Sequence, residues 1–384
     1  MALRILNRFP GANVRLLSLR QAPDPEVVFT ADPHGGTEAL WFDFRIEDPD
    51  PPATVPEQLT LTLRFFGNLL GGNDPARLRP VMREPGKSWN RLRAPSVTVL
   101  DDGQPLLRWT IPYPTTRTEI AFSHPYGRDE LEVLLQRAKG YWREESIGLT
   151  QGGRVLTRLD NQVGAANGGN APRGLYLVAR QHSGETPGSW VLDGLLEAIS
   201  RARNAGWCVW AVPFANLDGV VAGDYGKDPF PYDLNRAWGH PPMRHEIRVL
   251  QSDMRRWAAR CRPELVLDLH APGACEQEGV YAFANPANPA NPEADRALQA
   301  WGNVLGKALA PEFAAHPFVR KAEHASRWET PRVSDYVQSA FGCAALSIET
   351  PYAVCRDSLM TPKQYREVGR RMAQAILGRW QNTK

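Results

Sequence analysis

The stretch Gly174-Leu-Tyr-Leu-Val-Ala179 is followed directly by Arg180-Gln-His182-Ser-Gly-Glu185 and then by Thr186-Pro187. The first six residues form an almost continuous apolar run, which is typical of a strand buried on both faces of a parallel sheet. Thr186 and Pro187 fit the N-cap and the first position of a helix, which we expect to continue to about Arg203. A buried strand that leads through a short loop into a helix predicts an α/β unit.

The same alternation continues towards the C-terminal end. Further apolar strands are expected at residues 207–213, 265–269 and 343–348, and further helices at 243–260, 293–309, 334–341 and 361–380. Strands that alternate with helices predict an α/β domain over residues 126–384, with a mixed, largely parallel sheet flanked by helices. In such sheets ligands bind beyond the carboxyl ends of the strands, so we expect the functional residues directly after each strand.

Residues 1–125 have a different pattern. Short runs rich in aromatic and β-branched residues are separated by turn signals, with no long helical pattern between them. We expect strands at residues 39–46, 59–65, 96–100, 105–111 and 118–123. Several short strands at this spacing predict an antiparallel β-sandwich domain in front of the α/β domain.

Charge and cysteine usage exclude several classes of protein. The 384 residues contain 45 Lys and Arg against 42 Asp and Glu, and a net charge of only +3 argues against a nucleic-acid partner. The five cysteines form no C-x-x-C pair, so neither a disulfide framework nor a thiolate zinc site is indicated. Arginines interrupt the apolar runs at the N-terminus, and no stretch approaches the roughly 18 apolar residues of a membrane span. We therefore expect a cytoplasmic protein with no membrane partner, and leave its oligomeric state open.

Three of the expected strands end in side chains that can bind or use a metal ion. His182 and Glu185 follow the first strand, His270 follows the strand at 265–269, and Glu349 follows the strand at 343–348. Two imidazoles and a carboxylate are the donor set of a catalytic zinc site with one open position. Asp268 is a candidate for outer support of the ligands, and Glu349 is a free carboxylate able to take a proton from water. Each residue alone is common by chance, and only their joint placement favours a metal site.

A second group of polar residues lies at Asp233-Leu-Asn235-Arg236. Arg236 can grip a carboxylate through its bidentate fork, and Asn235 can add an amide N–H. A glycine-rich loop over residues 216–227 precedes this group and has the flexibility to approach a ligand closely.

The order of these motifs resembles the zinc metallocarboxypeptidases, and most of all their cytosolic carboxypeptidase branch. The family's H-x-x-E motif is matched by His182-Ser-Gly-Glu185, and its Asn-Pro-Asp-Gly loop by Asn216-Leu-Asp-Gly219. Its Asn-Arg pair is matched by Asn235-Arg236, its third zinc ligand by His270 and its catalytic glutamate by Glu349. The branch also carries an N-terminal β-sandwich, so the resemblance covers nearly the whole chain.

The resemblance implies a zinc-dependent hydrolase that removes C-terminal residues, with the tail of a peptide or protein as its substrate. One Zn²⁺ would be held by His182, Glu185 and His270, and Glu349 would act as the general base. Asn235 and Arg236 would hold the terminal carboxylate of the substrate, since a site built for that group rejects analogues without it.

The chain departs from the family in two places. Gly226 stands where the family has an arginine that stabilises the oxyanion, and the neighbouring Lys227 is expected to replace it as a point charge near the substrate. The substrate-binding tyrosine of the family has no clear match, although Tyr336 and Tyr352 lie near Glu349 in the sequence. The side-chain preference is left open.

Two other functions remain open at this point. A zinc-dependent amide deacylase on a related fold would use the same ligands, and the glycine at position 226 leans slightly towards it. A non-catalytic protein that binds C-terminal tails would use the same pocket without turnover. The sandwich and the Asn235-Arg236 pair favour the carboxypeptidase.

Overall fold

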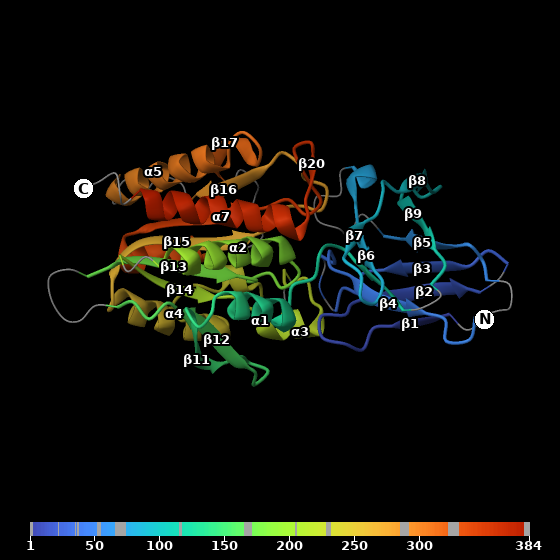
Figure 1. The fold of residues 1–384 in the computed structure, drawn as a ribbon, viewed down its shortest axis with the longest axis horizontal. Helices are drawn as coiled ribbons and strands as arrows, with labels where there is room; N and C mark the ends of the chain where they lie inside the picture. Colours follow the sequence, from blue (N-terminus) through green and yellow to red (C-terminus); the bar gives the residue numbers. More distant parts are fainter. Residues whose placement is uncertain are drawn as a thin grey trace.

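The computed structural model describes residues 3–21, 23–34, 36, 38–51, 55–65, 74–114, 117–164, 171–203, 206–227, 232–284, 292–321 and 330–379. The strands of the N-terminal part lie at one end of the elongated molecule, and a larger sheet with its helices forms the other end (Figure 1). This arrangement agrees with the predicted order of a sandwich followed by an α/β region, while the boundary near residue 125 stays a prediction.

The N-terminal strands form two five-stranded sheets around a shared core. One sheet has the order β1 (Arg4–Leu6), β4 (Asp43–Glu47), β10 (Thr118–Ala121), β6 (Val81–Arg83), β7 (Asn90–Arg91). The other has the order β2 (Arg15–Arg20), β3 (Glu26–Thr30), β5 (Gln58–Leu63), β9 (Pro105–Pro112), β8 (Ser96–Val99). The sandwich is antiparallel as predicted except at β3 and β5, which pair in parallel. The reason is that the chain crosses to the other sheet as β4 before it returns as β5.

The large sheet has eight strands in the order β11, β12, β14, β13, β15, β18, β16, β17. Their bounds are β11 (Arg143–Leu149), β12 (Val155–Asp160), β13 (Arg173–Ala179), β14 (Trp207–Val212), β15 (Arg262–His270), β16 (Val280–Ala284), β17 (Ala314–Lys321) and β18 (Ala344–Glu349). The four central strands β14, β13, β15 and β18 are parallel, whereas β11, β12 and β16 introduce antiparallel pairs. The predicted mixed, largely parallel sheet is confirmed. A short hairpin of β19 (Val354–Cys355) and β20 (Ser358–Leu359) follows it.

Helices cover both faces of this sheet (Figure 1). One face packs against α1 (Arg128–Arg137), α2 (Thr186–Ala202), α5 (Pro292–Leu309) and α7 (Pro362–Gly378). The other face packs against α4 (His245–Ala258) and α6 (Val333–Phe341), and α3 (Leu217–Ala222) follows β14. Helix α2 begins at Thr186 with Glu185 as its N-cap, one residue earlier than predicted. Within the described residues, no helix has the length and apolarity needed to cross a membrane.

The carboxyl ends of the central strands face the sandwich. A single apolar cluster joins sandwich residues such as Trp41 and Phe122 to Tyr225, Ala271 and Tyr352, which lie in loops beyond those strand ends. The loops that carry the predicted metal ligands are therefore enclosed between the two sheet systems.

Candidate active site

Parallel pairing brings the predicted metal ligands together. Strands β13 and β15 pair in register up to Ala179 and Leu269, so the loop after β13 and the end of β15 meet at one edge of the sheet. His182, Glu185 and His270 each offer a ligand atom there, and these atoms lie within 4.8 Å of one another. All three side chains are buried.

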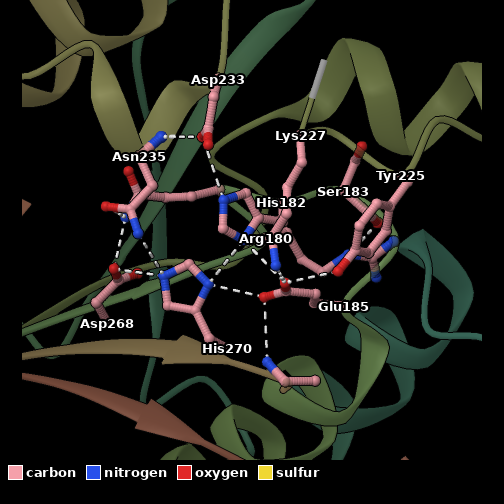
Figure 2. A network of polar contacts seen from close by, with 12 residues as sticks. Arg180, His182, Ser183, Glu185, Tyr225, Lys227, Asp233, Asn235, Asp268 and His270 are labelled. Atoms are coloured by element: carbon pink, nitrogen blue, oxygen red, sulfur yellow. Dashed lines mark hydrogen bonds and ion pairs between the residues drawn. The ribbon is translucent and has the colours of Figure 1, made fainter. Parts of the chain in front are cut away.

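The δ nitrogens of both histidines face the Glu185 carboxylate (Figure 2). His182 Nδ1 lies 2.8 Å from Glu185 Oε1, and His270 Nδ1 lies 2.7 Å from Glu185 Oε2. The two Nδ1 atoms are 3.1 Å apart. Three donor atoms thus converge from two elements, and two imidazoles with one carboxylate are a set that zinc accepts while keeping a further position open.

The ε nitrogens of the same rings are held by two other carboxylates. His182 Nε2 lies 3.1 Å from Asp233 Oδ1, and His270 Nε2 lies 2.6 Å from Asp268 Oδ2. A ring whose Nε2–H donates to a carboxylate presents the lone pair of Nδ1, which is how outer partners orient metal-binding histidines. The pattern therefore fits a metal ion between the two Nδ1 atoms.

Asp268, which the sequence offered as outer support for the ligands, is itself held in place by two further side chains. Gln181 Nε2 donates to Asp268 Oδ2 at 2.7 Å, and Trp238 Nε1 donates to Gln181 Oε1 at 2.7 Å. The partnership of Asp233 with His182 was not predicted, because the two residues are 51 positions apart and only the folded loop brings them together.

Charges around the cluster set the protonation of the histidines. Burial lowers the pKa of His270, but Asp268 and Glu185 raise it more, so its pKa lies well above 6.5. Burial also lowers the pKa of His182, and Glu185 and Asp233 bring it to a net value above 6.5. Burial raises the pKa of Glu185, yet His182, Lys227 and His270 hold it well below 4.5. The cluster attracts positive charge, either as protons or as a cation.

Glu349 ends β18 beside this cluster. It is the register partner of His270 across β15 and β18, which places the two residues side by side on the sheet. The net pKa of Glu349 is about 7, above its ordinary value of 4.5. Burial is the main cause; His270 lowers the pKa and Glu185 raises it. A half-buried carboxylate with this pKa can exchange a proton near neutral pH.

Asn235 and Arg236 lie in the short helix η3 (Leu234–Arg236). Asn235 Nδ2 lies 3.3 Å from His270 Nε2, so this residue borders the cluster directly. The Arg236 guanidinium donates to the carbonyl of Asn235 at 3.0 Å, and within the described residues it forms no ion pair. Its remaining N–H groups are available to an incoming carboxylate.

The glycine at position 226 has a steric cause. Its φ is +96°, and a Cβ there would lie 2.6 Å from the backbone nitrogen of Ser183 and 2.8 Å from its Oγ. An arginine side chain cannot occupy this position without moving the loop between the ligands. Lys227 instead places its Nζ 3.2 Å from Glu185 Oε1, so a positive charge is present in the site.

The two tyrosines considered from the sequence lie in different places. Tyr336 packs beside Trp238 on α6, away from the cluster. Tyr352 is buried and packs edge-on against Phe122, and its hydroxyl borders the cluster, where burial, Tyr225 and Glu185 raise its pKa well above 10. A third tyrosine, Tyr225, places its hydroxyl 3.4 Å from Glu185 Oε1. Only its position next to Gly226 in the glycine-rich loop could have suggested this from the sequence.

Comparison with known proteins supports the resemblance. No protein-family model matches the chain. Human cytosolic carboxypeptidase 2 is 24% identical over 255 residues, which are 60% of this chain and 28% of that protein. Cytosolic carboxypeptidase 1 of Xenopus laevis is 28% identical over 169 residues, which are 37% of this chain and 14% of that protein. A metallo-carboxypeptidase from Burkholderia cenocepacia has a TM-score of 0.79 at 19% identity, with both chains fully covered.

The chain is similar in sequence to cytosolic carboxypeptidases and has the fold of solved metallo-carboxypeptidases. A second solved metallo-carboxypeptidase, from Pseudomonas aeruginosa in complex with (2-guanidinoethylmercapto)succinic acid, superposes with a TM-score of 0.72 at 21% identity over 98% of this chain and 99% of that one. The metallocarboxypeptidase fold thus covers the sandwich as well as the large sheet. The chain spans less than a third of the length of either of these two cytosolic carboxypeptidases.

Proposed function

We propose that this protein is a zinc-dependent carboxypeptidase that removes C-terminal residues from peptides or proteins. The observation that carries the proposal is the convergence of two Nδ1 atoms and one carboxylate, with each Nε2 held by its own aspartate. The similarity to cytosolic carboxypeptidases adds weight to this reading of the cluster. A cytoplasmic location, and the absence of membrane and nucleic-acid partners, stay predictions from the sequence.

His182, Glu185 and His270 would hold the zinc ion. When bound, zinc would lower the pKa of a water molecule and polarise the scissile carbonyl. Glu349 would accept the proton of that water and deliver it to the leaving amine, a role that its pKa of about 7 suits. Asp233 and Asp268 would keep both rings in the tautomer that offers Nδ1.

Asn235 and Arg236 would bind the terminal carboxylate of the substrate, and Lys227 would add charge on the side of Glu185. Burial lowers the pKa of Lys227, but Glu185 and Glu349 raise it above its ordinary 10.5, so the ammonium stays charged. A compact ammonium can stabilise developing negative charge but lacks the planar fork of arginine.

The test is a set of synthetic peptides that vary at the last residue, each made as a free acid and as a C-terminal amide. We expect release of the last residue from some free acids and none from the amides, with zinc near one equivalent per chain. Glu349→Gln should lower kcat about 1000-fold while zinc stays bound. Glu246→Gln is the control, because Glu246 is a fully buried glutamate in α4 that bonds Arg244 and lies outside the cluster.

Each alternative has its own signature in this experiment. Hydrolysis of N-acylated amino acids without peptide cleavage would favour the amide deacylase. Binding of free-acid peptides without turnover would favour a non-catalytic tail-binding protein. Full activity of Glu349→Gln would show that Glu349 is not the general base.

A further inference from the structure

The N-terminal sandwich makes direct hydrogen bonds to the loop that enters the site. The Gly11 nitrogen donates to the Val221 carbonyl at 2.9 Å, and Asn13 Nδ2 donates to the Gly223 carbonyl at 2.8 Å. Gly223 has a φ of +78°, and a Cβ there would lie 2.2 Å from the Ala12 carbonyl oxygen. The two backbones therefore touch at a point where only glycine fits.

Asn13 is a rigid contact point. It is buried, its backbone exchanges hydrogen bonds with Asp43 at 2.8 and 2.9 Å, and its Oδ1 accepts from the Asp32 nitrogen at 2.7 Å. Its Nδ2 also donates to the Asp32 carbonyl at 2.9 Å. The amide can make these bonds in only one orientation, with Nδ2 towards the two carbonyls and Oδ1 towards the Asp32 nitrogen. A side chain held this way can fix the Gly223 carbonyl rather than follow it.

From Gly223 the contact continues to the metal ligands through residues 223–227, here called the prop segment. The Asp224 carbonyl accepts from Ser183 Oγ at 2.8 Å, and the Tyr225 carbonyl accepts from the Gly184 nitrogen at 3.0 Å. Ser183 and Gly184 lie between the ligands His182 and Glu185. The prop segment then places Tyr225 and Lys227 against the Glu185 carboxylate (Figure 2).

A second part of the sandwich touches the ligand loop itself. A Cβ at Gly184 would lie 3.0 Å from Trp41 Cβ, so this tryptophan closes the space over the loop. Trp41 Nε1 also donates to the Gly11 carbonyl at 2.8 Å, which ties it to the backbone that contacts Val221. His34 Nδ1 also lies 2.6 Å from Asp224 Oδ1, within hydrogen-bond distance.

We infer that the sandwich helps to position the metal site. Asn13 acts as a positioning residue, because it holds the prop segment against the loop between His182 and Glu185. The inference rests on the proposed function only in taking zinc as the occupant of the cluster. Nothing in the sequence indicates it, because Asn13 and Gly223 are 210 residues apart.

The experiment compares Asn13→Ala with the matched variant Thr62→Val in the full chain. Thr62 is buried in the same sandwich and donates to Glu26 Oε1 at 2.7 Å, far along the chain from the prop segment, so its loss weakens the sandwich alone. The readouts are amide hydrogen exchange of residues 182–186 in the metal-free protein, zinc affinity by chelator competition, and the absorption spectrum of the cobalt-substituted protein.

We expect Asn13→Ala to speed exchange at Gly184 about tenfold, to weaken zinc binding about three- to tenfold and to shift the cobalt bands. Thr62→Val should lower the melting temperature with none of these changes. If Asn13→Ala fails to fold, Trp41→Phe keeps an aromatic ring at this position but removes the N–H donor and part of the packing, and we expect the same changes to a smaller extent.

Equal exchange in Asn13→Ala and wild type, or equal changes in both variants, would overturn the positioning role. The exchange measurement needs no metal, so it decides this role even if the wild-type protein binds no zinc and the proposed function fails. Conversely, peptide cleavage by a protein whose site is indifferent to Asn13 would keep the function and reject the positioning role.

Discussion

Two buried charge clusters in this molecule differ in how their charges balance. One joins α1, α2 and α7: Asp193, fully buried, accepts from Arg137 and Arg366 at 2.7 Å each and from the Tyr126 hydroxyl at 3.1 Å. Glu197 lies 3.7 Å from Arg137 and 2.6 Å from the exposed Arg201, so two carboxylates face three guanidinium groups. Each carboxylate of this cluster therefore has its own cationic partners and needs no cation from outside.

The cluster at the strand ends is not balanced. Glu185, Asp233 and Asp268 supply three carboxylates, and Lys227 supplies one ammonium group. With neutral imidazoles, these four directly contacting groups keep two negative charges, and Arg180, Arg236 and Glu349 act on them from around the cluster. The excess of carboxylates next to the two imidazoles favours a cation there. The first, balanced cluster joins three helices, whereas in the second, unbalanced cluster the carboxylates outnumber the ammonium group that contacts them.

The largest expected effect is at a proposed ligand. His270→Ala removes a metal donor and leaves Asp268 without its imidazole partner. Zinc affinity, measured by competition with a chelator, should fall by more than the roughly 100-fold that loss of an outer partner costs. Unchanged affinity would show that the unbalanced cluster is not the metal site.

The balanced cluster should respond in the opposite way. Asp193→Asn removes the charge shared by Arg137 and Arg366, so we expect the free energy of unfolding to fall by about 2 kcal/mol in a denaturant titration. Zinc affinity should stay at the wild-type value, because the cluster lies outside the site. A large loss of zinc affinity in Asp193→Asn would show that the balanced cluster also contributes to metal binding.

Zinc binding should weaken as the pH falls. The carboxylates raise the pKa of both His182 and His270 above 6.5 in the metal-free protein, so protons compete with the metal for the two Nδ1 atoms. Between about pH 8 and pH 6, apparent affinity should drop by up to about tenfold per unit for each imidazole that must lose a proton. Affinity that is constant over this range would mean that the histidines are not the ligands.

The smallest effect concerns Glu349 in the metal-free protein. Since folding raises its pKa from 4.5 to about 7, the protonated form contributes stability that is fully present below about pH 4.5 and is lost as the pH rises through 7. Glu349→Gln mimics the protonated form, so it should raise the melting temperature slightly at pH 8 and leave it unchanged at pH 4. A lower melting temperature at pH 8 would contradict the sign of the shift.

Much of the fold could be predicted because its strands and helices carry clear patterns. The buried strands β13, β14, β15 and β18 were recognisable as apolar runs, and α2, α4, α5, α6 and α7 by their spacing and end signals. The strands β11, β12, β16 and β17 and the helix α1 were not predicted. In β11 and β17, which lie at the edges of the sheet, exposed and charged residues dilute the pattern. The short helix α3 and the parallel pair of β3 and β5 were missed because neither follows from local sequence.

The site divides in the same way. His182, Glu185, His270 and Glu349 could be named from the sequence, since each follows an apolar strand and parallel strands end at one edge. Apart from Asp268, the partners of those residues could not be named, because a contact such as that between His182 and Asp233 depends on how loops close.

The sequence by itself determined the four central strands of the sheet, the sandwich architecture and the four strand-end residues, because burial and backbone periodicity act locally. Only the tertiary structure decided that Lys227 takes the place next to Glu185, since the packing of Gly226 on Ser183 leaves no room for a side chain there. It also decided that Asn13 touches the loop to the site, because contacts between segments 210 residues apart depend on the packing of the two sheet systems.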